Sequence, residues 1–180
     1  MFNFFKKNKK EETPKEENKN EEAPKDARRL AQAAANAQDV RQAVELYSEA
    51  IKVEKGKPNP DKLFLSEIYR LRGDIYFSQG VAILSSSDFL HAIENNPKNG
   101  IAHNNLGVWF SIKQFAKPDY KRAIEHLDLA VKYCPDRPDF VMNRAVMKVR
   151  NGQKEIGRKE LEDLYQQGYA DAKIAIERFC

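Results

Sequence analysis

Apolar residues recur along most of this chain at the three- and four-residue intervals of an amphipathic α-helix. In residues 39–54 they occupy Val40, Ala43, Val44, Leu46, Tyr47, Ala50, Ile51 and Val53. Segments with this spacing alternate with short breaks that contain Gly, Pro or Asn. The pattern predicts an all-α chain with helices over 26–37, 39–54, 61–79 and 81–95, a pair in 100–136, a pair in 138–168 and a short helix at 170–178.

The expected helix ends follow from local chemistry. Asp26 is a predicted N-cap, because its carboxylate can accept a hydrogen bond from a free backbone N–H group of the first turn. Asn59 is predicted to cap the third helix, with Pro60 in its first turn. Pro118 is expected to open the helix after a longer turn, and Asp136 to cap the segment entered through Pro138.

Small residues recur between the apolar ones at fixed offsets. One segment carries Leu106, Gly107, Phe110, Ala123, Leu127, Ala130 and Pro135. The preceding segment carries Tyr69, Gly73, Tyr76, Phe89, Ala92 and Pro97 at corresponding offsets, and Gly73 lies 107 − 73 = 34 residues before Gly107. Two antiparallel helices approach closely only where side chains are small, so this spacing predicts repeated helical hairpins.

This pattern resembles the tetratricopeptide repeat (TPR), a 34-residue helix–turn–helix unit. Weaker matches flank the two good ones, at Ala43, Tyr47 and Ala50 upstream, and at Val141, Ala145, Lys148, Gly157, Leu161 and Leu164 downstream. The resemblance covers about residues 26–167. It implies a TPR-type solenoid with repeats at about 26–57, 61–99, 100–136 and 138–168, followed by a capping helix at 170–179.

The resemblance also implies a binding groove lined by the first helix of each repeat, and a non-enzymatic adaptor that binds a partner protein or peptide there. The groove positions predicted to contact the partner are Arg70, Asp74, Asn104, Asn105, Val108 and Asn143. Asparagine amides can donate to and accept from an extended backbone, and arginine can bind carboxylates. Ordinary solvated groove surface is the alternative for Asn104 and Asn105.

TPR domains that bind the acidic C-terminus of chaperones use a Lys, two Asn, a further Lys and an Arg. Asn105 matches one of these asparagines, whereas Arg70 replaces the first Lys and Asp74 the other Asn. Asp139 and Asn143 stand at the last two positions. The resemblance therefore implies a different ligand.

Residues 1–25 contain seven Lys and six Glu, and after Phe5 no large apolar residue, so they are predicted to be a disordered tail. Its start, with Phe2, Phe4, Phe5, Lys6 and Lys7, combines aromatic and basic residues as peripheral membrane segments do. Two interpretations stay open: contact with an anionic membrane surface, and a tail with incidental aromatics.

Composition narrows the function classes. Net charge is +4 with both signs interspersed, which gives no basic stripe for nucleic acid. The cysteines, Cys134 and Cys180, make no disulfide framework, and the three histidines have no metal-ligand spacing. No nucleophile triad or phosphate-binding glycine loop is recognisable. We therefore expect a cytoplasmic protein without metal or cofactor, with peripheral attachment to the cytoplasmic membrane face as the open alternative; the sequence leaves its oligomeric state open.

Overall fold

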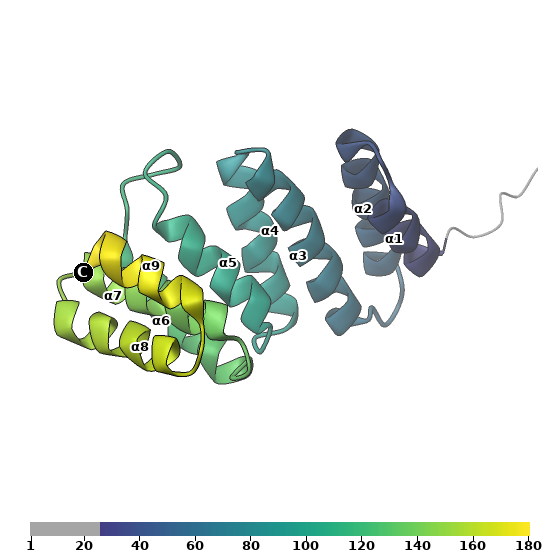
Figure 1. Cartoon of the computed structure of the whole chain (residues 1–180). Helices are drawn as coiled ribbons and strands as arrows, with labels where there is room; N and C mark the ends of the chain where they lie inside the picture. Colours follow the sequence, from purple (N-terminus) through teal and green to yellow (C-terminus); the bar gives the residue numbers. More distant parts are fainter. Residues whose placement is uncertain (1–25) are drawn as a thin grey trace, which may run out of the picture.

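The computed structural model describes residues 26–180, which form nine α-helices and, within that range, no strand. They are α1 (Ala27–Asn36), α2 (Val40–Lys55), α3 (Lys62–Ser78), α4 (Ala82–Asn95), α5 (Gly100–Phe110), α6 (Tyr120–Tyr133), α7 (Pro138–Arg150), α8 (Lys154–Gln166) and α9 (Ala170–Phe179). Four helical hairpins stack side by side in chain order, with α9 across the last one (Figure 1). The predicted all-α helical-repeat solenoid is confirmed.

Acidic and amide side chains begin most of these helices. Asp26, Asp39, Asp61, Asn99 and Asp119 each accept a hydrogen bond from a backbone N–H group of the first turn. This bond satisfies one of the donors that a helix leaves free at its start.

Three predicted helix starts were wrong by one or two residues. The cap of α3 is Asp61 rather than Asn59, and α6 begins at Tyr120, after its cap Asp119, rather than at Pro118. The cap position of α7 is Arg137, before Pro138, rather than Asp136. In the first two cases a carboxylate nearer the helix was available to accept the bond, and a carboxylate is a good cap.

The apolar core is continuous between neighbouring hairpins. One cluster joins α1 and α2 to α3, α4 and α5, and a second joins α6 to α7, α8 and α9. Leu65 packs in the first cluster, and Phe64 lies against it. Leu63, beside them in the sequence, is 67% exposed and takes no part in this cluster.

Glycines set the separation of the two helices within a hairpin. A Cβ atom on Gly107 would lie 2.7 Å from Cγ of Leu127, and one on Gly73 would lie 2.8 Å from the ring of Phe89. A Cβ on Gly157 would lie 2.4 Å from the carbonyl oxygen of Ala145. These contacts leave no room for a methyl group, so the glycines are required by packing.

Two half-buried arginines bind neighbouring hairpins together in the same way. Arg72 of α3 donates to both carboxylate oxygens of Asp88 on α4, at 2.8 and 2.7 Å, and to Ser48 of α2 at 2.8 Å.

Arg144 of α7 donates to both oxygens of Glu160 on α8, at 3.2 and 3.1 Å, and to Asp128 of α6 at 3.3 Å. Each arginine precedes the small residue of its hairpin by one position. Each therefore holds the second helix of its own hairpin and that of the preceding one.

We expect Gly157→Ala to destabilise the protein by about 1–3 kcal/mol, the usual cost of forcing extra atoms into a packed contact. The new methyl group would meet backbone atoms of α7, which cannot rotate aside as a side chain can. Urea unfolding followed by circular dichroism measures the change.

Gly56→Ala is the control. Gly56 has φ −75°, and a Cβ there meets nothing closer than 3.5 Å. Its stability should match or slightly exceed that of the original protein. An equal loss in both variants would show that helix separation does not depend on Gly157.

Candidate functional site

A chain of polar side chains crosses three first helices of neighbouring hairpins. Glu67, Arg70 and Asp74 lie on one face of α3, at the three- and four-residue spacing of a helix. Asn104 and Asn105 follow on α5, and Asn143 on α7. We call these six residues the groove network.

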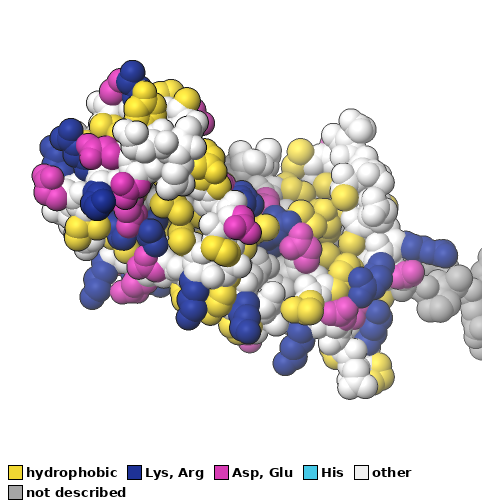
Figure 2. Space-filling view, turned by 60° about the horizontal axis from the view of Figure 1, so that its bottom comes forward, with side chains coloured by type: hydrophobic (Ala, Val, Ile, Leu, Met, Phe, Trp, Pro, Cys, Tyr) yellow, Lys and Arg dark blue, Asp and Glu magenta, His cyan; other side chains and the backbone are white. Residues whose placement is uncertain are grey.

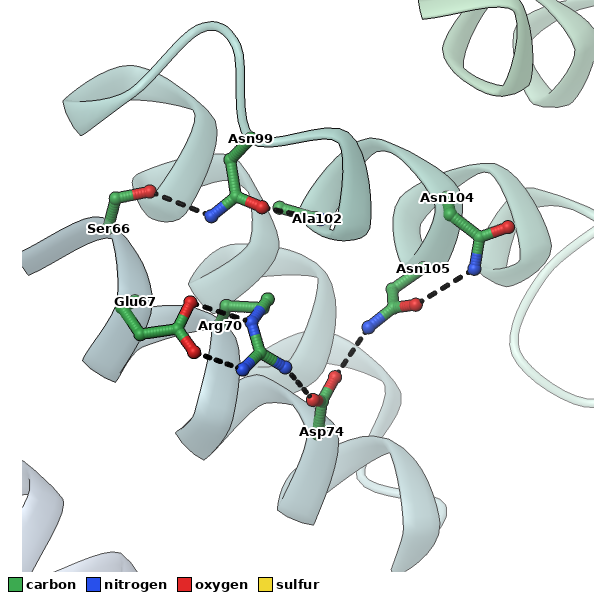
Figure 3. A network of polar contacts seen from close by, with 8 residues as sticks. All are labelled: Ser66, Glu67, Arg70, Asp74, Asn99, Ala102, Asn104 and Asn105. Carbon is green, nitrogen blue, oxygen red and sulfur yellow. Dashed lines mark hydrogen bonds and ion pairs between the residues drawn. The ribbon is translucent and has the colours of Figure 1, made fainter. Parts of the chain in front are cut away.

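In the α3 part of the groove network, one guanidinium forms ion pairs with two carboxylates (Figure 3). Arg70 Nε donates to Glu67 at 3.0 Å, and Arg70 Nη2 donates to the other oxygen of Glu67. Arg70 Nη1 donates to Asp74 Oδ2 at 2.5 Å. Arg70 is only 9% exposed, so this arrangement neutralises a buried cation.

Amides continue the groove network across α5 to α7. Asn105 Nδ2 donates to Asp74 Oδ1 at 2.5 Å, and Asn104 Nδ2 donates to Asn105 Oδ1 at 3.0 Å (Figure 3). Asn143 Nδ2 donates in turn to Asn104 Oδ1 at 3.0 Å. Each asparagine uses one N–H group in this way, and its second N–H is left for another acceptor.

Burial and charge act against each other in the groove network. Burial raises the pKa of Asp74, because it disfavours the charged carboxylate more than Arg70 and the Asn105 amide favour it. Burial alone would lower the pKa of Arg70, but its bonds to Glu67 and the charge of Asp74 outweigh that, and the pKa is raised. The arginine therefore stays charged.

A concavity of about 400 Å³ opens between α3 and α5 beside the groove network. It is lined by Asp74, Phe77, Ile101, Asn104, Asn105 and Val108. The combination of three apolar side chains with a carboxylate and two amides suits a segment that offers an apolar side chain together with polar backbone groups.

The structure brings together four of the predicted groove residues, since Asp74, Asn104, Asn105 and Val108 line this one concavity. Arg70 does not line it, because Glu67 and Asp74 hold its guanidinium. Asn143 lines a separate cleft and reaches the concavity only through its bond to Asn104. The predicted membrane contacts Phe2, Phe4, Phe5, Lys6 and Lys7 lie outside the described residues.

Two residues of this region were not among the predicted site residues. Glu67 completes the ion pairs of Arg70. Phe115, in the inserted turn before α6, lies 5.6 Å from the ring of Phe77 and 6.0 Å from that of Trp109, which places it at the edge of the concavity. The sequence contains a signal for Phe115, because the turn that lengthens this repeat carries an aromatic residue.

The histidines take part in packing. His103 Nδ1 and His126 Nδ1 lie 3.0 Å apart, and the ring of His126 stacks on Phe110. Burial lowers the pKa of His126 to about 4, so both rings are neutral at physiological pH. Across residues 26–180, no three His, Cys, Asp or Glu side chains converge as a metal site would require.

On the face shown in Figure 2, hydrophobic side chains lie in small groups between charged ones. This distribution favours local docking points over one wide apolar surface. Among the helices of residues 26–180, none combines the length and apolar character needed to cross a bilayer.

Comparison with solved structures shows which fold this is. The TPR protein YrrB, described as having an unusual peptide-binding site, aligns with a TM-score of 0.67 and 17% identity, over 84% of this chain and 74% of its own. MamA aligns with a TM-score of 0.63 and 14% identity, over 82% of this chain and 81% of its own. BtubC from P. vanneervenii aligns with a TM-score of 0.60 and 19% identity, over 76% of this chain and 58% of its own.

No protein-family model matches the chain, and no curated protein matches it by sequence. At these identities the structural likeness establishes the fold alone. The chain has a TPR-like helical-repeat fold, as its 34-residue period predicts.

We expect Arg70→Gln to destabilise the protein by about 1–3 kcal/mol, because it removes the charge-assisted hydrogen bonds to Glu67 and Asp74, whose side chains are 49% and 37% exposed and so remain partly solvated. The control is Arg28→Gln, which removes an ion pair to Asp61 whose side chains are 63% and 42% exposed. That loss should stay below about 1 kcal/mol. Urea unfolding at pH 7 compares them, and equal losses would mean that burial of Arg70 has no energetic effect.

Proposed function

We propose that this protein is a non-enzymatic scaffold that binds a segment of a partner protein in the concavity between α3 and α5. The observation that carries this proposal is the ordered row of amides, held by the Asp74 carboxylate, beside three apolar side chains in one concavity. Apolar walls provide affinity, and a few fixed polar groups provide orientation.

The groove network supports this proposal because it holds the amides in place before a ligand arrives. Asn105 is bonded on one side to Asp74 and on the other to Asn104, so its side chain has little freedom left to lose on binding. Its second N–H group can donate to a backbone carbonyl of an extended segment. Arg70 acts in this scheme as a positioning residue, because it fixes Asp74 rather than meeting the ligand.

The structural neighbours give further support at the level of function class. YrrB is described as a TPR protein with a peptide-binding site, and it aligns over most of the present chain. A stack of helical hairpins presents an extended surface that repeat proteins commonly use for binding. Peptide or protein partners are therefore the ligand class that fits this fold and this concavity together.

The test uses a peptide selected from a displayed random library on the full chain, labelled and titrated by fluorescence anisotropy. Val108→Lys puts a longer, charged side chain into the space that the ligand would fill and should weaken binding at least about tenfold, since it both occupies the hollow and must lose water when a ligand covers it. Leu90→Lys, at a site 52% exposed on α4, should leave the affinity unchanged. Unchanged affinity in Val108→Lys would move the binding site elsewhere.

A second proposal concerns the start of the chain, where Phe2, Phe4 and Phe5 are followed by Lys6 and Lys7. We propose that this segment recruits the scaffold to an anionic membrane surface. In flotation at low salt, the full chain should be recovered with phosphatidylserine-containing vesicles. A variant that lacks residues 2–10 should not be recovered with them. Absence of binding by the full chain, or equal binding by both, would reject recruitment by this segment.

A further inference from the structure

A second cleft of about 370 Å³ lies between α7 and α9, at the end of the stack away from α1 (Figure 1). Its lining comes from Met142, Asn143, Val146, Met147, Arg150, Asp171, Ile174, Ala175, Arg178 and Phe179. We call it the α7–α9 cleft. Its lining shares no residue with that of the α3–α5 concavity, and the bond between Asn143 and Asn104 links the two.

The middle of the α7–α9 cleft is apolar and open. Met142 and Val146 of α7 face Ile174 of α9, and the Ile174 side chain is 61% exposed. The helix that ends a stack of repeats usually presents a polar outer face. Single exposed apolar residues are common, but this one shares a hollow with two others, which makes it part of a surface that another side chain can fill.

One end of the α7–α9 cleft carries two arginines without acidic partners. The guanidinium carbons of Arg150 and Arg178 lie 4.9 and 5.3 Å from the ring centre of Phe179. Neither side chain makes an ion pair or hydrogen bond with any other part of residues 26–180, whereas Arg70, Arg72 and Arg144 are each held by carboxylates.

Helix electrostatics explain only part of this arrangement. Both arginines lie in the last turn of their helices, where a cation is favourable beside the helix dipole. The dipole does not require them to converge on one aromatic ring at the rim of an apolar hollow. Asp171 is the one acidic residue that lines the cleft, so the cationic end has an excess of positive charge.

We propose that the α7–α9 cleft binds a partner segment in which an aliphatic or aromatic residue lies next to one or more carboxylates. The apolar side chain would fill the hollow over Met142, Val146 and Ile174. The carboxylate would accept hydrogen bonds from Arg150 and Arg178, which are already held against Phe179. This adds a second docking point to the proposed scaffold and does not depend on the α3–α5 concavity.

A second copy of this chain fits the cleft less well than an acidic partner. A twofold contact through α9 would bring together four arginines, two from each cleft, against the two Asp171 carboxylates. Two positive charges would stay uncompensated in the contact, which opposes association. An acidic apolar segment removes this excess, and charge complementarity therefore selects it.

The experiment titrates the full chain with two labelled ten-residue peptides. In one, two leucines and a phenylalanine precede three aspartates; in the other, asparagines replace the aspartates. We expect the acidic peptide to bind about tenfold more tightly at 50 mM salt, with a preference that falls as salt screens the arginines. Arg150→Gln with Arg178→Gln should abolish the preference, and Ile174→Ser should weaken binding of both peptides.

Lys173→Gln is the matched control, because Lys173 is an exposed cation of α9 that does not line the cleft. It should keep the preference, as should Val108→Lys, so that failure here is distinguishable from failure of the α3–α5 site. Equal affinity of the two peptides for the unaltered chain would overturn the proposal. So would a preference that survives in the double arginine variant, or a dimer in sedimentation that Ile174→Ser dissociates.

Discussion

The close approach of the two helices in each hairpin is the constraint on which the rest of this structure depends. At Gly73, Gly107 and Gly157 the facing helix lies so near that even a methyl group would overlap with it. Because the helices touch there, large residues beside the contact, such as Phe89 and Leu127, are fully buried. This separation in turn fixes how the next hairpin stacks, and so which side chains line the groove.

Polar groups in the interior are used to lock hairpins to one another. Arg72 and Arg144 each span three helices through carboxylate and hydroxyl partners, in the second and fourth hairpins. The third hairpin has a neutral pair of rings, His103 and His126, between its helices instead. A buried ion pair is worth little net energy, but it is costly to separate, so these contacts favour one stacking geometry over its alternatives.

The two candidate docking points differ in how their charges are arranged. In the α3–α5 concavity the cation Arg70 is bound from within the chain, and the surface that remains is amide and apolar. In the α7–α9 cleft the cations Arg150 and Arg178 lie against the ring of Phe179 and have no acidic partner within residues 26–180. A ligand that fills both would therefore need backbone polar groups at the first and negative charge at the second.

The sequence by itself determined the helices, the cap of the first one and the period of 34 residues. These features depend on neighbours within a turn or two, where residue type alone decides, as the carboxylate of Asp26 shows. It also placed Asp74, Asn104 and Asn105 on one face, since first helices repeat in register.

Only the tertiary structure decided which partners these side chains take. Asn143 bonds to Asn104 across 39 positions. The sequence placed Arg70 among the groove residues, and the structure adds that its guanidinium is bonded to Glu67 and Asp74, because a desolvated cation needs carboxylate partners. Contacts between side chains of different helices depend on how the whole stack packs, and a local sequence pattern does not determine that packing.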